Sequence, residues 1–268
     1  MTTELDAIAF KAQTHPKHRF QNLFGTLNAD ALYRAWGNLN KQSKAGIDGV
    51  EASQYEASLS SNIQTLAEKL KCKRYRANDV KRVYIPKANG KQRPLGLPTL
   101  EDKIVQQSVA DIVQSIWEQD FLCSSYGYRP NKSAHQAVHS LQLNLQFKGY
   151  GYIVEADIKG FFDNMDHEWL MRMLRRRIDD ERLLTQINQW LKARIKEPDG
   201  IYHKPQSGTP QGGVISPVLA NIYLHYALDI WFEKKIKPHL NGEAMLIRYA
   251  DDFMVAFQYH NEAKAFYD

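Results

Sequence analysis

The sequence contains little cysteine and no long apolar run. Only Cys72 and Cys123 occur among its 268 residues, too few for the disulfide frameworks of small secreted proteins. No apolar stretch approaches the roughly 20 residues that span a bilayer, and the segment Met1–Asp6 has no signal-peptide pattern. We therefore expect a cytoplasmic protein without membrane contact, in which both thiols are inert packing residues.

Repeats, low-complexity tracts and heptad arrays are also absent, which excludes solenoids and long coiled coils. The chain is 43% hydrophobic and 24% charged, values that are ordinary for a globular protein. At this length it can bury the core of one or two domains.

Positive charge is concentrated in one window of the chain. Residues 69–93 hold ten Lys or Arg against the single acid Asp79, whereas residues 151–268 hold 15 basic and 17 acidic side chains. Such a run is often only a solvated face, but this local excess fits the neutralisation of phosphates. We expect the window to bind nucleic acid through Lys69, Lys71, Lys73, Arg74, Arg76, Lys81, Arg82 and Lys91.

Three carboxylates stand at the ends of strand-like segments. Asp251 and Asp252 lie between two runs of β-forming residues, which favour a hairpin with the pair at its turn, and the predicted strand 152–158 carries Asp157 near its end. An acidic pair in a turn is more often merely solvated. Three converging carboxylates, however, raise one another's pKa unless a cation compensates, and oxygen ligands suit Mg²⁺. We expect these three side chains to hold two Mg²⁺ ions, with Mn²⁺ as a substitute, and to be catalytic in in-line nucleotidyl transfer.

A second predicted hairpin carries basic residues at its tip. Residues 80–87 form a strand-like run, Asn89-Gly90 is a strong tight-turn signal, and residues 91–97 can return as the partner strand. Lys87 and Arg93 would then face a triphosphate, for which the planar fork of arginine is well suited.

A glycine-containing loop and one aromatic residue are further candidates for contact with a nucleotide or template. In the loop 207–213, Gly212 and Gly213 would allow close approach to a base pair or template, and Gln211 offers both a donor and an acceptor. Phe162 could lie under the sugar of an incoming nucleotide and exclude a 2′-hydroxyl. A plain loop and ordinary core packing are the respective alternatives.

Helix-capping signals divide the remaining chain. Thr99, Ser133 and Asp166 are predicted caps, and Ser216-Pro217 predicts the start of a long helix that continues through Ile230. Arg175, Arg176 and Arg177 follow the Asp166 helix and are either solvated or turned toward nucleic acid.

In order, five segments resemble the reverse-transcriptase domain of group II intron-encoded proteins, and together they cover nearly the whole chain. They are residues 85–99, which begin Ile-Pro-Lys and end Arg-Pro-Leu-Gly-Leu-Pro-Thr, the Tyr-Gly-Tyr-Arg-Pro of 126–130, the Ala-Asp-Ile-Lys-Gly-Phe-Phe-Asp of 156–163, the Gly-Thr-Pro-Gln-Gly-Gly of 208–213 with its continuation to Pro217, and the Tyr-Ala-Asp-Asp of 249–252.

The resemblance implies an α/β (α+β) fold, a right-hand polymerase with fingers and palm, in which an antiparallel palm sheet packs on helices. It implies an N-terminal extension over residues 1–60, fingers over 61–150 and palm over 151–268, with some fingers segments within 175–210. The metal ligands become Asp157, Asp251, Asp252 and the backbone carbonyl of Ile158. The nucleotide-binding residues become Lys87, Arg93, Phe162 and Gln211, and Arg129, Gly212 and Gly213 join the nucleic-acid contacts.

The implied partners are an RNA template (intron RNA or another RNA), a DNA primer and dNTPs, and the implied activity is reverse transcription together with assistance to intron splicing. Family members continue beyond the position of Asp268 with the rest of the palm and a thumb, so we expect this polypeptide alone to polymerise weakly or not at all. Two other interpretations stay open: an RNA-binding splicing module with little polymerase activity, and a reverse transcriptase of a bacterial defence or spacer-acquisition system. The sequence does not indicate an oligomeric state.

Overall fold

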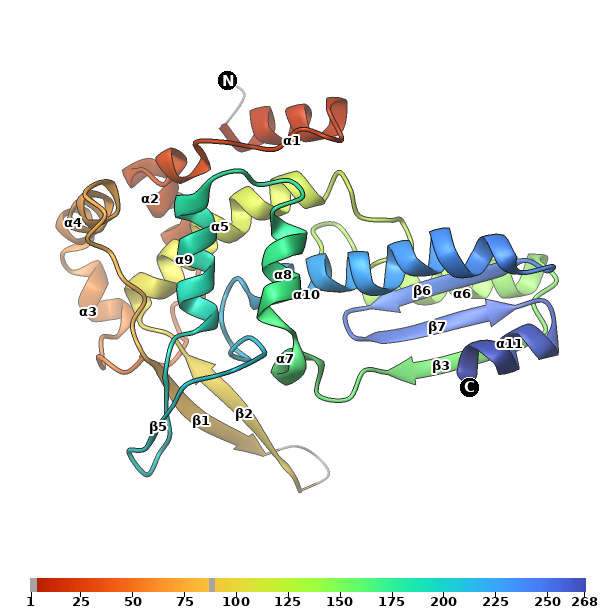
Figure 1. Cartoon of the computed structure of the whole chain (residues 1–268). Coiled ribbons are helices and arrows are strands. Elements are labelled where there is room, and N and C mark those ends of the chain that lie inside the picture. Colours follow the sequence, from red (N-terminus) through yellow and green to blue (C-terminus); the bar gives the residue numbers. More distant parts are fainter. Residues whose placement is uncertain (1–3, 87–89) are drawn as a thin grey trace. The chain divides into compact units, whose positions relative to one another are not determined.

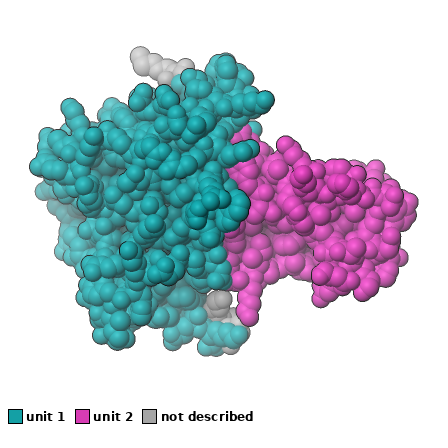
Figure 2. All heavy atoms as spheres, viewed as in Figure 1, with its two compact units in different colours: residues 1–119, 162–216 teal, residues 120–161, 217–268 magenta. Residues whose placement is uncertain are grey.

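The chain forms two compact units, each assembled from two separate stretches of sequence (Figure 2). Unit 1 comprises Met1–Gln119 and Phe162–Ser216, and unit 2 comprises Asp120–Phe161 and Pro217–Asp268. The computed structural model describes residues 4–86 and 90–268. The division into extension, fingers and palm follows the family resemblance rather than compactness, and it stays a prediction.

The core of unit 1 is built around α5 (Leu100–Trp117), which α1 and α2 cover (Figure 1). The predicted cap is confirmed, because the Thr99 side chain accepts a hydrogen bond from the backbone N–H of Asp102. Apolar positions such as Ile104, Val109 and Ile116 are fully buried. The other helices that unit 1 contains or shares at its edge are α1 (Glu4–Thr14), η1 (Leu23–Thr26, a 3₁₀ turn), α2 (Ala29–Asn38), α3 (Ala52–Glu56), α4 (Leu59–Lys71), α7 (Phe161–Asn164), α8 (His167–Leu174) and α9 (Glu181–Leu191).

A four-stranded sheet completes unit 1, in the order β2-β1-β4-β5. The predicted basic hairpin is confirmed: β1 (Val80–Pro86) pairs antiparallel with β2 (Gln92–Leu97). Two short strands, β4 (Ile195–Lys196) and β5 (Tyr202–His203), extend the sheet, and β4 runs parallel to β1. Lys87, predicted for the tip of the hairpin, lies outside the described residues.

Unit 2 contains a three-stranded antiparallel sheet in the order β3-β7-β6. The strands are β3 (Tyr152–Asp157), β6 (Ala244–Tyr249) and β7 (Asp252–Phe257), so the predicted strand and the predicted acidic hairpin are both confirmed. Helix α6 (Ala134–Phe147), capped by Ser133 as predicted, packs against β6, and α11 (His260–Tyr267) packs against β3 and β7. This is the mixed helix-and-sheet fold that the sequence predicts.

The helix predicted from Ser216 through Ile230 is not regular along its length. It is α-helical in α10 (Ser216–Leu224) and then widens into two π-helical segments, η2 (His225–Asp229) and η3 (Phe232–Ile236), before the 3₁₀ turn η4 (Lys237–His239). The first wide turn carries His225, Leu228 and Asp229 into the interior. π-Turns of this kind are frequent at functional sites.

Both cysteines differ from their prediction. Cys72 and Cys123 are free and exposed. Cys72 lies at the C-cap of α4 and Cys123 lies in the irregular segment after α5, so neither is on a buried helix face. Across the part of the chain that the structure describes, no helix is long and apolar enough to cross a membrane.

Buried His225 makes the stability of unit 2 depend on pH. Burial lowers the pKa of this imidazole from 6.5 to about 4, although the carboxylate of Asp229 opposes the shift. Arg248, Arg129 and Lys234 add to the lowering. Because the unfolded chain takes up this proton at a higher pH than the folded chain, the stabilisation is complete above pH 6.5 and disappears as the pH falls toward 4.

We expect this loss to reach about 3 kcal/mol in the free energy of unfolding, which urea titration at a series of pH values measures. His225→Leu removes the titrating group and should flatten the profile between pH 6.5 and 4. An unchanged slope in His225→Leu would contradict the assignment.

Candidate active site

The acidic hairpin places its two carboxylates by means of a tight turn. Tyr249 and Asp252 pair across β6 and β7, so Ala250 and Asp251 form a two-residue loop. Ala250 has a φ of 58°, in a position where hairpins of this kind usually carry glycine or asparagine. A left-handed alanine stores about 1–3 kcal/mol of strain that the surrounding structure must compensate.

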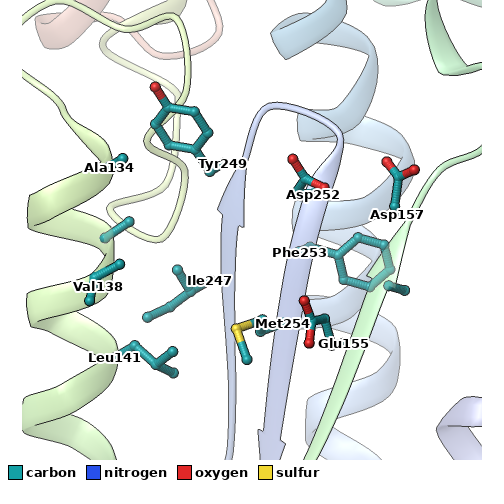
Figure 3. Close-up of a pocket in the computed structure, with 12 residues that line it drawn as sticks. Ala134, Val138, Leu141, Glu155, Asp157, Ile247, Tyr249, Asp252, Phe253 and Met254 are labelled. Carbon is teal, nitrogen blue, oxygen red and sulfur yellow. The ribbon is translucent and has the colours of Figure 1, made fainter. Parts of the chain in front are cut away.

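Asp157 lies directly beside this turn. It is the register partner of Asp252 across β3 and β7, and the backbone N–H of Ile158 donates to the carbonyl of Asp251 at 3.4 Å. Figure 3 shows the Asp157 and Asp252 carboxylates at the same end of the two strands, with Glu155 farther along β3. The structure therefore brings the middle of the sequence beside the late acidic pair.

Electrostatic repulsion is built into this arrangement. Desolvation, together with the charges of Asp157 and Asp251, raises the pKa of the Asp252 carboxyl above its ordinary value. Like charges directly opposite each other destabilise a pair of strands. A bound cation would remove this cost, so the charge and the oxygen donors fit a hard divalent metal.

The charge of the three carboxylates suits a metal ion, but the arrangement of their side chains does not form a complete metal site. Among residues 4–86 and 90–268, no group of three or more His, Cys, Asp or Glu side chains is arranged to hold a metal ion. The carbonyl of Ile158, a predicted ligand, accepts a hydrogen bond from the Phe161 N–H at 3.1 Å and keeps its second lone pair. The joint site of three carboxylates and Ile158 stays a prediction.

Arg248, which the sequence analysis did not single out, binds the turn between β6 and β7 from the protein interior. Its fully buried guanidinium forms a two-pronged ion pair with Asp229, at 2.8 and 2.7 Å. It also donates to the Ala250 carbonyl and Asn221 Oδ1, both at 2.9 Å, and to Ser125 Oγ at 2.7 Å. The guanidinium thus fixes the strained residue next to the acidic pair. The only signal in the sequence is an arginine within the strand-like run before the acidic pair. The strand pattern alone does not show whether that side chain is buried or exposed.

The Tyr-Gly-Tyr-Arg-Pro segment also packs against the turn. The Tyr126 N–H donates to the Arg248 carbonyl at 2.9 Å, and a Cβ on Gly127 would lie 2.3 Å from the Ala250 nitrogen. Only glycine permits this approach. Arg129, predicted to contact nucleic acid, donates to the carbonyls of Leu122 and Ser125. Part of its guanidinium therefore serves the fold.

A groove of about 430 Å³ borders the two opposed carboxylates within unit 2 (Figure 3). One wall is the apolar face of α6, and the other is the open face of the sheet. Its lining includes Val138, Leu141, Ile247, Met254, Asp157 and Asp252.

Three of the predicted nucleotide-binding residues belong to unit 1, and two of them are linked. Arg93 Nε donates to Gln211 Oε1 at 3.2 Å, and Gln211 Nε2 donates to the Asp163 carboxylate at 3.2 and 3.3 Å. Phe162 and Gln211 both line a cavity of about 290 Å³ in this unit. The amide of Gln211 therefore bridges a cation and a carboxylate.

The predicted glycines have a structural reason for their identity. The N–H of Gly96 donates to the Gln211 carbonyl at 2.6 Å, which ties the 207–213 loop to β2. Gly212 has a φ of 106°, and a Cβ there would lie 2.7 Å from the Gly96 carbonyl oxygen. At Gly213 a Cβ would meet Ser216 Oγ at 2.7 Å. Close packing within unit 1 accounts for both residues.

The basic window is partly neutralised by the protein itself. Lys69 pairs with Glu101 at 3.0 Å, and Arg82 pairs with Glu197 at 3.3 Å, with both side chains of the second pair mostly buried. The other predicted cations of this window are exposed, namely Lys71, Lys73, Arg74, Arg76, Lys81 and Lys91. Fewer residues are therefore available to bind phosphates than the number of Lys and Arg side chains in the window predicts.

Arg177 differs from both alternatives offered for the arginine triplet. Its side chain is buried in unit 1 and donates to the backbone carbonyls of Ala12 and Pro16. It therefore anchors the end of α1 and the segment that follows it, instead of facing solvent or nucleic acid.

A model of the family described as "Reverse transcriptase (RNA-dependent DNA polymerase)" matches residues 85–268. The chain belongs to the reverse transcriptase family. The match contains the three aspartates, Arg93, Phe162 and Gln211, and members of this family use divalent metal ions.

Two relatives share much of the chain. Protein YkfC of Escherichia coli (strain K12) is 37% identical over 244 residues, which are 88% of this chain and 63% of YkfC. The group II intron-encoded protein LtrA of Lactococcus lactis subsp. cremoris is 39% identical over 235 residues, 87% of this chain and 39% of LtrA. The resemblance to group II intron-encoded reverse transcriptases is confirmed. The chain spans about two-fifths to just under two-thirds of the length of these relatives.

The fold recurs in a solved structure entitled "Partial Cas6-RT-Cas1--Cas2 complex". The alignment has a TM-score of 0.50 at 24% identity and covers 96% of this chain and 38% of that one. At this identity the match shows a shared fold.

Proposed function

We propose that this chain carries the RNA-directed DNA polymerase activity of a group II intron-encoded reverse transcriptase. Its reaction would add a deoxynucleotide to a DNA primer paired with an RNA template. The single observation that carries the proposal is the register pair of Asp157 and Asp252 beside Asp251, at the positions where the family motif has its metal ligands.

In the proposed mechanism, the carboxylates of Asp157, Asp251 and Asp252 would hold two Mg²⁺ ions, and the backbone carbonyl of Ile158 would be a further ligand. When bound, these ions supply charge stabilisation for the attacking 3′-oxygen and the leaving pyrophosphate. The protein supplies fixed carboxylate oxygens, and Arg248 keeps the turn that carries them from moving. A displacement of about 1 Å at such a site can cost roughly 100-fold in rate.

The family resemblance gives residues of unit 1 proposed roles in nucleotide binding. Arg93 and Lys87 bind the triphosphate, where a cation stabilises the negative charge that develops. Gln211 holds Arg93 through its Oε1, and Phe162 discriminates against ribonucleotides. Binding of intron RNA for splicing is proposed for the exposed basic residues between 71 and 91.

The proposal is tested by primer extension on an annealed RNA template with dNTPs and Mg²⁺. Single-nucleotide incorporation with enzyme in excess over primer reports the chemistry even when grip on the primer is weak. We expect incorporation that requires the divalent ion and the RNA-paired primer. If the chain binds RNA but gives no incorporation with Mg²⁺ or Mn²⁺, the RNA-binding splicing module becomes the better interpretation.

Gln211→Leu should raise the KM for dNTP by about 10-fold with a smaller change in kcat. The reason is that loss of one hydrogen-bonded amide between Arg93 and Asp163 costs about 1 kcal/mol or more in positioning the guanidinium. Steady-state incorporation at varied dNTP concentration measures the change. Gln206→Leu, at an exposed position of the same segment, is the matched control. An equal KM in the two variants would exclude Gln211 from nucleotide binding.

A further inference from the structure

Unit 1 contains a second cavity, separate from the one lined by Phe162 and Gln211. It has a volume of about 310 Å³ and is lined by η1, by the segment after α4 and by one side of α9. This volume falls at the lower end of the roughly 300–1,000 Å³ typical of ligand pockets. The residues used below are Phe24, Lys73, Tyr75, Arg76, Arg182 and Gln186.

The deepest of these residues carries an unused hydrogen-bond donor. Gln186 is only 4% exposed, and its Nε2 is buried without a hydrogen-bond partner. A buried donor that stays unpaired costs about as much as a lost hydrogen bond. Because the terminal torsion of glutamine is broad, a small rotation presents the amide to a ligand in the cavity that it lines.

The rim of the cavity is positively charged. Lys73 and Arg76 are exposed there, and the Arg76 Nη1 donates to the carbonyls of Lys73 and Tyr75, both at 2.8 Å, which fixes the direction of the guanidinium. The one lining carboxylate, Glu181, forms an ion pair with Arg175. The local charge therefore favours an anion.

One wall offers a flat, delocalised surface. The Arg182 guanidinium lies over the Phe24 ring, 4.4 Å from its centroid. Nucleobases stack on arginine planes and on aromatic rings. Tyr75 contributes its ring only, because its hydroxyl already bonds to Asp102 and accepts from Trp190.

We propose that this cavity binds one splayed-out nucleotide of a single-stranded RNA segment. The base enters beside Arg182 and Phe24, one of its carbonyl oxygens accepts from Gln186 Nε2, and its phosphate lies between Lys73 and Arg76. Unpaired RNA bases are commonly held in this way, by stacking and by hydrogen bonds to their edges. The choice of RNA as ligand rests on the proposed function, whereas the donor, the charge and the stacking surface do not.

The experiment measures the affinity of the chain for a fluorescein-labelled 12-nucleotide single-stranded RNA by anisotropy, without dNTPs. We expect Gln186→Leu to weaken binding about 5- to 10-fold, since one hydrogen bond is lost. Gln186→Glu should weaken it more, because its carboxylate cannot donate and repels phosphate. Gln64→Leu, on the exposed side of α4, is the matched control and should bind like wild type.

Folding and location have their own readouts. Gln186→Leu removes an unpaired buried amide, so its thermal midpoint should be at least that of wild type. Ultraviolet crosslinking with uridine-containing RNA should label peptides that contain Phe24 or Tyr75. Wild-type affinity in Gln186→Leu, or crosslinks confined to other peptides, would overturn the proposal.

Failure of the pocket and failure of the polymerase assignment are distinguishable. If wild type incorporates nucleotides while Gln186 variants bind RNA normally, the pocket is wrong and the proposed function stands. If incorporation does not depend on Asp157 or Asp252 while Gln186→Leu loses RNA affinity, the proposed function is wrong and the pocket stands.

Discussion

Replacement of Asp252 by asparagine is expected to reduce single-nucleotide incorporation by at least about 10³-fold, because metal-assisted charge stabilisation contributes several kcal/mol. Asparagine preserves the shape of the side chain but removes the charge that would hold a divalent cation. Asp157→Asn is expected to have the same effect, since Asp157 is the register partner of Asp252. The assay is incorporation on an RNA-templated primer with enzyme in excess.

The Asp252→Asn variant should lose activity without losing stability against unfolding. Desolvation, together with the charges of Asp157 and Asp251, raises the pKa of the Asp252 carboxyl. Asp252→Asn removes this unfavourable charge and should unfold at a urea concentration no lower than wild type. The matched control is Glu155→Gln. Glu155 lies on β3 two residues before Asp157, and its carboxylate lines the same groove. Glu155→Gln should keep its incorporation rate. Equal losses of incorporation rate in Glu155→Gln and Asp252→Asn would contradict this expectation. They would mean that the reaction depends on the total negative charge of the groove and not on a pair of metal ligands.

The second large effect concerns Arg248. Arg248→Met leaves the fully buried Asp229 without its partner, and breaking a buried ion pair on one side costs about 3–5 kcal/mol. The carbonyl of left-handed Ala250 also loses its donor at 2.9 Å. We expect a large fall in the midpoint of urea unfolding, together with an incorporation rate reduced by about 100-fold, because the carboxylates shift with the turn.

A double variant separates stability from positioning. Arg248→Met with Asp229→Leu replaces the ion pair by apolar side chains, and such replacements are often neutral or stabilising. We therefore expect the double variant to recover most of the stability but little of the activity, since no guanidinium holds Ala250. Recovery of full activity along with stability would show that Arg248 serves only the fold.

Much of the architecture could be predicted because its signals are local. The Asn89-Gly90 turn between two strand-like runs predicted the β1–β2 hairpin, and Thr99, Ser133 and Asp166 predicted caps that the structure shows. The motif around Asp157 predicted a strand that ends at a carboxylate. These features depend on short-range backbone preferences, which the sequence displays directly.

The features that could not be predicted depend on long-range contacts. Arg177 and Arg248 look like surface cations in the sequence, yet both are buried. Arg177 donates to backbone carbonyls far away in the sequence, and Arg248 forms an ion pair with Asp229. The wide turns at His225–Asp229 replace a helix whose apolar pattern looks regular. The prediction that Cys72 and Cys123 are packing residues is wrong for a related reason. Burial depends on what packs against a segment and not on residue type alone.

The central claim is that Asp157 and Asp252 jointly hold a divalent cation, and binding of Mn²⁺ followed by electron paramagnetic resonance tests it most directly. Titration of wild type should show a bound class of Mn²⁺ that either Asp157→Asn or Asp252→Asn removes and Glu155→Gln retains. Mn²⁺ binding that survives both asparagine replacements unchanged would contradict the account.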